Sequence, residues 1–131
     1  MSRREARNKA FYLLFQLDFA QEDERDTVKR IFWEENEIPS EGDRNFITKE
    51  VDGVLENLAE IDTEIDKYAK GWSTNRMSKV DLAILRLAVY EIKYSEETPN
   101  SVAVNEAVEL AKKYSSDEAP GFINGILGKI A

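Results

Sequence analysis

Apolar residues recur every three or four positions along most of the chain, which is the spacing of amphipathic helices rather than strands. The broadest apolar face lies in residues 77–94. Ser78 can cap the first turn of this segment, and Asp81 stands where a capping box places the carboxylate that reaches back. A helix this apolar needs neighbours on several sides, so we expect it to form the centre of the fold. Its apolar positions are Val80, Ala83, Ile84, Leu85, Leu87, Ala88, Val89 and Ile92.

Further helices are predicted on both sides of this central segment. Ser2 and Ser40 are the expected N-caps of two of them. The longest helical pattern runs to Trp72, and we expect it to break near residues 60–63, because Asp62 is a good N-cap for a new helix. Residues 71–75 are expected to form the connector before the central segment. The apolar pattern and the turn residues place these helices at residues 3–20, 26–36, 40–72, 102–114 and 119–130.

The pattern predicts an all-α fold. No segment shows the alternation of a strand bounded by turns, and 131 residues are enough to bury a core of their own. The first helix has two lines of apolar side chains, of which the second is aromatic. The first line consists of Ala6, Ala10, Leu13, Leu14 and Leu17. The second consists of Phe11, Phe15 and Phe19.

The composition excludes several kinds of chemistry. The chain contains no cysteine and no histidine, so it has no disulfide, no thiolate nucleophile and neither the usual general base nor the commonest metal ligand. Carboxylate, lysine and tyrosine chemistry would remain, but no motif supports an enzyme. The basic N-terminus lacks the apolar stretch of a signal peptide, and no run approaches a membrane span, so we expect a cytoplasmic protein.

Charge is distributed unevenly along the chain. The net charge is −8, which taken alone argues against a nucleic-acid partner. Residues 1–17, however, carry Arg3, Arg4, Arg7 and Lys9 against the single carboxylate of Glu5, so their net charge is +3 and the rest of the chain carries −11. An acidic body with one basic tip can bind a polyanion at the tip and a basic partner elsewhere.

The arginines of this tip oppose the dipole of the helix that they begin, because a helix N-terminus favours anions. Arg3, Arg4 and Arg7 are grouped on one side, and Phe11 follows four residues after Arg7. This grouping is typical of arginine-rich helices that contact RNA phosphates and stack on unpaired bases. The alternative, that the arginines only keep a helix end soluble, stays open on the sequence alone.

Three blocks in this order and spacing carry a family resemblance over essentially the whole chain. The first runs from Arg3 to Leu17, and the second, VDLAILRLAVYE, covers residues 80–91. The third covers residues 99–112, PNSVAVNEAVELAK, and is followed by FINGIL at residues 122–127. Together they resemble the NusB family of bacterial transcription antitermination factors.

The resemblance implies a fold of about seven helices in two packed subdomains, residues 1–59 and 60–131. It also implies that the chain binds boxA, a single-stranded element of nascent RNA, together with NusE, a small-subunit ribosomal protein. In the family this pair helps to load an antitermination complex on RNA polymerase, notably during ribosomal RNA transcription. Neither catalysis nor a cofactor is implied.

The resemblance also implies functional positions. RNA-binding positions of the family fall on Arg3, Arg4, Arg7 and Phe122, and partner-binding positions fall on Tyr68 and Asp81. Phe122 could instead be a core residue of an amphipathic helix, and Asp81 is already accounted for as a capping residue. Two departures from the family pattern imply that RNA binding is weaker or depends more on NusE, and that one phosphate contact is lost. They are Glu5 within the basic run and Gly121, where some members carry a lysine.

Two other interpretations remain. NusB-like domains also dock the substrate in some ribosomal RNA cytosine methyltransferases, but this chain has neither the Gly-rich loop nor the catalytic cysteine of such an enzyme. The chain could also be a helical scaffold that binds only proteins and forms a homodimer, with Phe11, Phe15 and Phe19 at the interface.

Overall fold

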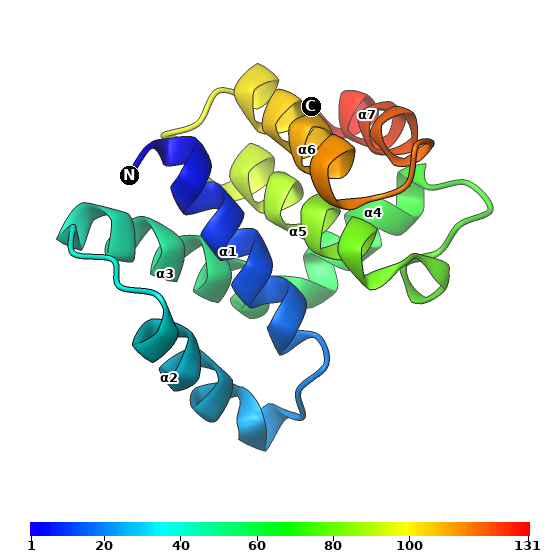
Figure 1. Cartoon of the computed structure of the whole chain (residues 1–131). Helices are drawn as coiled ribbons and strands as arrows, with labels where there is room; N and C mark the ends of the chain where they lie inside the picture. The colour runs from blue at the N-terminus through cyan, green and yellow to red at the C-terminus, as the bar shows by residue number, and fades with distance from the viewer. The chain divides into compact units, whose positions relative to one another are not determined.

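The computed structural model describes residues 1–131 and contains seven α-helices and no strand, so the all-α fold predicted from the sequence is confirmed (Figure 1). The chain divides into two compact units, Met1–Asp52 and Gly53–Ala131, earlier along the chain than the boundary expected near residue 60. No helix combines the length and the apolarity needed to cross a membrane. The helices are α1 (Arg3–Leu17), α2 (Arg25–Glu35), α3 (Glu41–Glu56), α4 (Leu58–Tyr68), α5 (Lys79–Tyr94), α6 (Asn100–Tyr114) and α7 (Ala119–Ile130), and two short 3-10 turns are η1 (Glu22–Glu24) and η2 (Thr74–Arg76).

The first unit consists of α1, α2 and most of α3. Ser2 caps α1 as predicted: its Oγ accepts a hydrogen bond from the Glu5 backbone N–H at 3.1 Å, and the Glu5 carboxylate reaches back to the Ser2 backbone N–H at 3.4 Å. Ser40 caps α3 in the same way, through the Asp43 backbone N–H at 3.3 Å. Both predicted N-caps are therefore confirmed. The buried apolar side chains include Ala6, Ala10, Phe11, Leu13, Leu14, Leu17, Phe32 and Ile47.

The three phenylalanines of α1 differ in exposure. The rings of Phe11 and Phe15 are stacked at 6.4 Å between centroids, and those of Phe15 and Phe19 meet edge to face at 5.1 Å. Phe11 is buried, whereas Phe19 is 62% exposed. The predicted aromatic line therefore exists, but only its C-terminal end lies at the surface.

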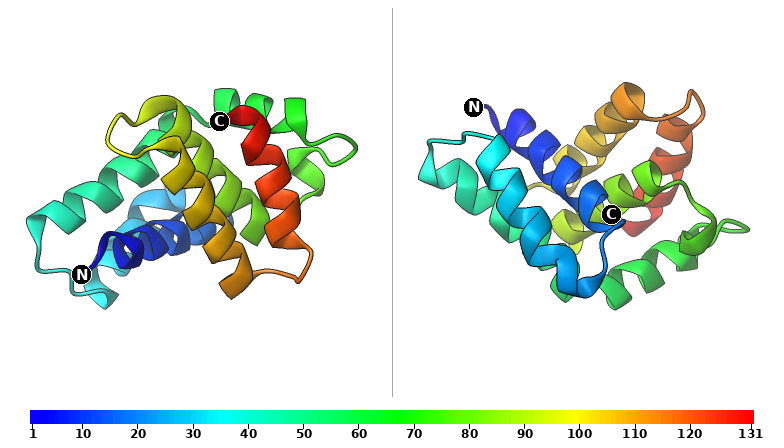
Figure 2. Two further views of the ribbon diagram at one scale, coloured as in Figure 1. Left: turned by 90° about the horizontal axis from the view of Figure 1, so that it is seen from above. Right: turned by 60° about the horizontal axis from the view of Figure 1, so that its bottom comes forward.

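The second unit is built around α5, which confirms the predicted central helix. Helices α4, α6 and α7 all pack against α5, and α6 also packs along α7 (Figures 1 and 2). The Ser78 Oγ accepts from the Asp81 backbone N–H at 3.1 Å, as expected for the cap. The Asp81 carboxylate does not reach back to complete a capping box, because it accepts instead from the Ser115 hydroxyl at 2.5 Å. The fully buried side chains of α5 are Ile84, Leu85, Leu87, Val89 and Glu91.

The break in the long helical pattern falls at Asn57, so the prediction of a break near Asp62 was wrong. Both the backbone N–H of Asn57, at 3.2 Å, and its side-chain amide, at 2.8 Å, donate to the Gly53 carbonyl at the end of α3. Asp62 lies inside α4 and accepts two hydrogen bonds from Arg86 of α5, at 2.9 and 2.8 Å. The Asp62 carboxylate, which the sequence predicted to cap a helix, instead forms an ion pair between α4 and α5.

Gly53, in the last turn of α3, is required by the close approach of Tyr90 on α5. A Cβ at this position would lie 2.2 Å from Cε1 and 2.3 Å from Cζ of the Tyr90 ring. These distances are far below van der Waals contact, and the Tyr90 ring is buried. Any larger residue here must displace a packed aromatic ring.

We therefore expect Gly53→Ala to destabilise the protein by about 1–3 kcal/mol through overpacking, although alanine is the better helix former. Urea unfolding measures this change in the free energy of unfolding. Gly125→Ala in α7 is the matched control, because a Cβ at Gly125 meets nothing within 4 Å. This control should be stabilising by about 0.5–1 kcal/mol. Equal effects at the two glycines would contradict the close approach to Tyr90.

Candidate functional site

The arginines at the start of α1 do not share one environment. Arg3 and Arg4 are exposed, whereas Arg7, one turn further along, is only 4% exposed. The sequence predicted a group of three arginines at this tip, and the structure presents two of them to solvent. The third is part of the packed interior, where a guanidinium must be satisfied by protein groups.

Phe46 of α3 brings Arg3 and Arg7 together. The Arg3 guanidinium carbon lies over the Phe46 ring at 4.1 Å from its centroid, and that of Arg7 lies at 5.5 Å from the same centroid. A cation within about 6 Å of a ring face is attracted by the negative potential of the aromatic π-system. One half-buried ring therefore holds two guanidinium groups of like charge at one place in unit 1.

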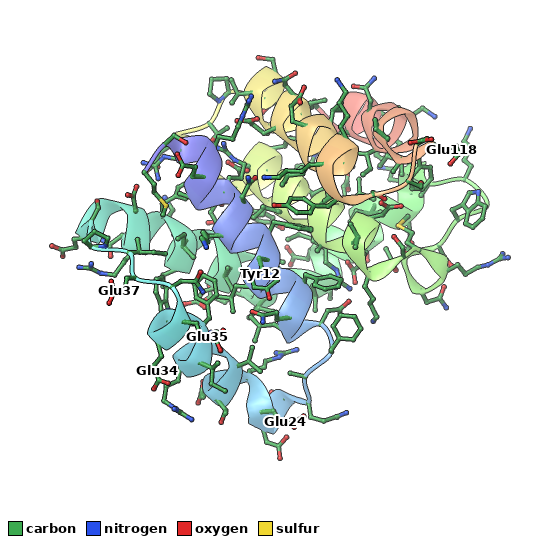
Figure 3. The ribbon with its side chains drawn as sticks, viewed as in Figure 1. Tyr12, Glu24, Glu34, Glu35, Glu37 and Glu118 are labelled. Atoms are coloured by element: carbon green, nitrogen blue, oxygen red, sulfur yellow. The ribbon has the colours of Figure 1, made fainter.

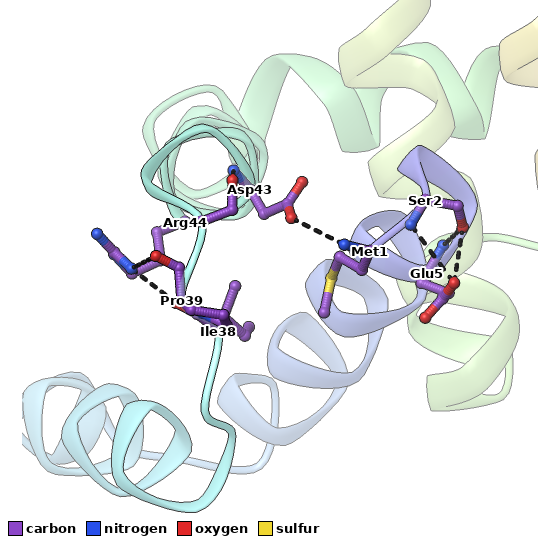
Figure 4. Close-up of polar contacts among 8 residues, drawn as sticks. Met1, Ser2, Glu5, Ile38, Pro39, Asp43 and Arg44 are labelled. Atoms are coloured by element: carbon purple, nitrogen blue, oxygen red, sulfur yellow. Dashed lines mark hydrogen bonds and ion pairs between the residues drawn. The ribbon is translucent and has the colours of Figure 1, made fainter.

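Polar contacts fix the start of α1 against the start of α3 (Figure 4). The Met1 amino group donates to the Asp43 carboxylate at 3.3 Å, next to the capping box formed by Ser2 and Glu5. Arg44, in the first turn of α3, donates to the carbonyls of Ile38 and Pro39 in the preceding linker, at 2.7 Å each. These bonds hold the first turns of α3, which carry Phe46, and so fix the position of the ring that contacts Arg3.

Negative charge in unit 1 gathers on and around α2. Glu24, Glu34, Glu35 and Glu37 are exposed, and their side chains project from α2 and its flanking turns (Figure 3). Two basic residues of α2 already have carboxylate partners: Lys29 pairs with Asp52 at 2.8 Å, and Arg30 pairs with Glu34 at 3.0 Å. A polyanion is therefore repelled by α2, and the start of α1 is the favourable part of this unit.

A groove of about 390 Å³ lies in unit 2 and includes two of the residues singled out in the sequence, Asp81 and Phe122. Phe122 is half-buried, so its ring borders solvent as well as the core. Asp81 at the start of α5 and Glu118 just before α7 give this groove an acidic side. The groove is lined by Trp72, Arg76, Met77, Ser78, Asp81, Ser116, Glu118, Ala119 and Phe122.

Trp72 lies in the connector that the sequence predicts at residues 71–75. The helical pattern also included Trp72 as its last apolar position, but α4 ends at Tyr68 and Trp72 is 54% exposed. The guanidinium of Arg76 lies 5.8 Å from the centre of the Trp72 ring. Gly71, which has a positive φ of 80°, lies in the turn after α4, where the Trp72 backbone N–H donates to the Ala69 carbonyl at 2.8 Å.

Tyr68 lies apart from the groove lining, although the resemblance groups it with Asp81. It is half-buried at the end of α4, and the neighbouring Lys67 ammonium lies 5.4 Å from the centre of its ring. No group of three or more acidic residues is placed to hold a metal ion. The arrangement as a whole offers cations on an aromatic ring in unit 1 and an aromatic, acidic groove in unit 2.

These features define a small all-helical protein with one cationic helix start on an acidic body. The chain belongs to the NusB family, whose family model matches residues 4–131. The transcription antitermination protein NusB of Agathobacter rectalis is 44% identical over 131 residues, which is 100% of both chains. The resemblance seen in the sequence is thereby confirmed.

Solved structures agree with this assignment. T. maritima NusB matches with a TM-score of 0.88 and 37% identity, over 100% of this chain and 91% of that one. A crystal structure of the antitermination factors NusB and NusE in complex with double-stranded RNA matches with a TM-score of 0.87 and 30% identity, over 98% of this chain and 94% of the matched one.

The different burial of Arg3 and Arg7 predicts different effects on stability. Arg7→Gln should lower the free energy of unfolding by about 2–3 kcal/mol, because it shortens a packed, buried side chain and removes the guanidinium that lies 5.5 Å from the Phe46 ring centre. Arg3→Gln should cost less than about 1 kcal/mol, the usual size of an exposed cation–π contact. Urea denaturation of both variants measures the difference. Losses of the same size would contradict the buried placement of Arg7.

Proposed function

We propose that the chain is an RNA-binding transcription antitermination factor. It would bind boxA RNA together with NusE and help to load an antitermination complex on RNA polymerase, notably for ribosomal RNA transcription. The observation that carries the proposal is the cationic start of α1, where Arg3 and Arg4 are exposed and Arg3 lies over Phe46. Membership of the NusB family supports the same conclusion.

In this proposal Arg3 and Arg4 contact the RNA directly, and Arg7 supports them from beneath. Guanidinium groups form strong, charge-assisted hydrogen bonds with phosphate oxygens. Because only a few cations are available, RNA binding by the chain alone should be modest, with a log–log salt slope of about −2 to −3 for a single strand. Phe122, whose ring borders solvent in unit 2, is proposed as a further RNA contact.

The solved complex that resembles this chain contains double-stranded RNA, whereas we propose a single-stranded ligand. The reason is physical: sequence-specific RNA recognition relies on unpaired bases that stack on aromatic rings or guanidinium planes. In a duplex these base faces are covered by their neighbours. Arg3, whose guanidinium lies over an aromatic ring, suits the exposed faces of a single strand.

The proposed site for NusE lies in unit 2. Tyr68 and Asp81 are the proposed contacts, and Asp81 shares its groove with Glu118 and two aromatic side chains. Carboxylates beside aromatic rings suit the basic side chains of a partner protein. The chain would act by binding alone, without catalysis or a cofactor, in the cytoplasm where transcription takes place.

A protein-only scaffold is a weaker interpretation. A self-interface through Phe11, Phe15 and Phe19 is incomplete, because Phe11 is buried and cannot contribute to it. The docking domain of a methyltransferase is likewise less well supported, because a curated relative matched over its whole length is named as an antitermination protein.

RNA binding tests the proposed tip. We expect Arg4→Glu to weaken binding of a boxA RNA at least about tenfold, because a charge-assisted hydrogen bond is replaced by repulsion. Arg30→Glu makes the same change of charge on α2, where exposed carboxylates already repel a polyanion, and should change affinity little. Fluorescence anisotropy at several salt concentrations, with and without NusE, measures both variants. Scrambled and duplex RNA serve as competitors. If both variants lose RNA affinity equally, only the net charge of the chain affects binding, and this result would contradict a site at the start of α1.

Partner binding has its own test. Asp81→Asn should weaken NusE binding several-fold but leave binding of RNA by the chain alone nearly unchanged, since the proposed RNA contacts are Arg3, Arg4 and Phe122 and the change keeps the shape of the groove. Ser115→Ala is the control, because it removes the hydrogen bond to Asp81 and keeps the charge. Calorimetric titration with NusE measures both variants. If Ser115→Ala weakens binding as much as Asp81→Asn, the carboxylate has a structural role only.

A further inference from the structure

We infer that Phe46 is a positioning residue that holds the Arg3 guanidinium flat, so that an unpaired RNA base can stack on its outer face. This inference rests on the proposed RNA-binding function and adds to it a mode of contact. Arg3 would then act as a planar shelf as well as a charge.

The geometry of Arg3 carries the inference. Its guanidinium carbon lies over the Phe46 ring at 4.1 Å from the centroid, close to the stacking distance of two planar groups. We infer from this distance that one face of the guanidinium meets the ring. Because Arg3 is exposed, this orientation would leave the opposite face toward solvent. The five N–H donors lie in the guanidinium plane and remain available to phosphate oxygens at its rim.

Several contacts keep the shelf in place before RNA arrives. Arg7 is buried and lies 5.5 Å from the centre of the same ring, so Phe46 cannot turn away without disturbing the core. The turn before Phe46 is held by the Ser40 cap and by the bond from Met1 to Asp43. A guanidinium ordered in advance loses less freedom on binding.

An unpaired base is the ligand that this arrangement suits. Phosphate needs only the charge and the in-plane donors, and it would not require an aromatic ring under the arginine. A base needs a flat, polarisable partner, and a guanidinium whose inner face is already covered offers one flat face. In the complex, the Arg3 guanidinium would lie between the Phe46 ring and the RNA base. Lysine cannot replace arginine here, because an ammonium is a point charge without a plane.

Conservative variants distinguish the shelf from a simple charge. Arg3→Lys and Phe46→Leu should each weaken boxA RNA binding about two- to fivefold, the usual range for one cation–π contact. Both should leave the salt slope unchanged, because the number of cations is the same. Arg3→Gln should reduce the slope by about 0.7, the value for one phosphate contact on a single strand. The double variant Arg3→Lys/Phe46→Leu should bind no more weakly than either single variant, and Phe46→Tyr should restore wild-type affinity.

An abasic scan of the RNA identifies the stacked base. At one position, removal of the base should weaken binding by the wild type but not by Arg3→Lys. Urea unfolding of each variant excludes loss of the fold as the cause. Additive losses in the double variant, or no abasic position that distinguishes the two proteins, would overturn the inference.

Measurements without RNA keep the inference separate from the proposed function. In the free protein, NMR should show the side-chain protons of Arg3 shifted upfield by the ring current of Phe46, and Phe46→Leu should abolish this shift. Absence of the shift in the wild type would overturn the shelf whatever the RNA results. A wild type that shows the shift but binds no RNA would overturn the proposed function and the stacked base together. RNA binding that Arg3→Lys leaves unchanged would overturn only the stacked base.

Discussion

Two guanidinium groups of like charge lie over one phenylalanine ring, and the candidate site depends on this contact. Arg3 and Arg7 would repel each other in an apolar environment, but the π-system of Phe46 attracts both. The ring therefore concentrates positive charge on a chain whose net charge is −8. The burial of Arg7 anchors the ring in the core, while Arg3 remains at the surface. A single aromatic side chain thus links the packing of unit 1 to its proposed chemistry.

The second unit depends on a different constraint, the burial of α5. This helix is apolar around most of its circumference, so α4, α6 and α7 must cover it. The last turn of α3 also approaches α5, so closely that Gly53 leaves no room for a Cβ beside Tyr90. Because these helices are fixed against α5, the ends of α5 and α7 hold Asp81 and Phe122 in one groove. Packing that satisfies an apolar helix also shapes the proposed partner site.

Sequence reasoning succeeded where the determinants are local. Capping serines at Ser2, Ser40 and Ser78 act over three residues, and apolar stripes repeat within one helix, so the helices could be predicted. Sequence reasoning failed where contacts between residues far apart in the chain determine the role of a side chain. Asp62 looked like a cap but pairs with Arg86 on another helix, and Arg7 looked like a surface charge but is buried. The contact of Arg3 with Phe46 joins residues far apart in the chain, and no helical spacing reveals it. The candidate positions themselves came from family resemblance.

The central claim is that RNA binds at the start of α1, on the guanidinium held by Phe46. An NMR titration of the isotopically labelled chain with a single-stranded boxA RNA tests this most directly, since it reports on every residue at once. The account predicts that the Arg3 and Arg4 side-chain signals and the backbone amides around Ser2 and Glu5 change first, while the acidic side of α2 stays unchanged. Changes confined to α2, or an unchanged start of α1 at saturating RNA, would contradict it.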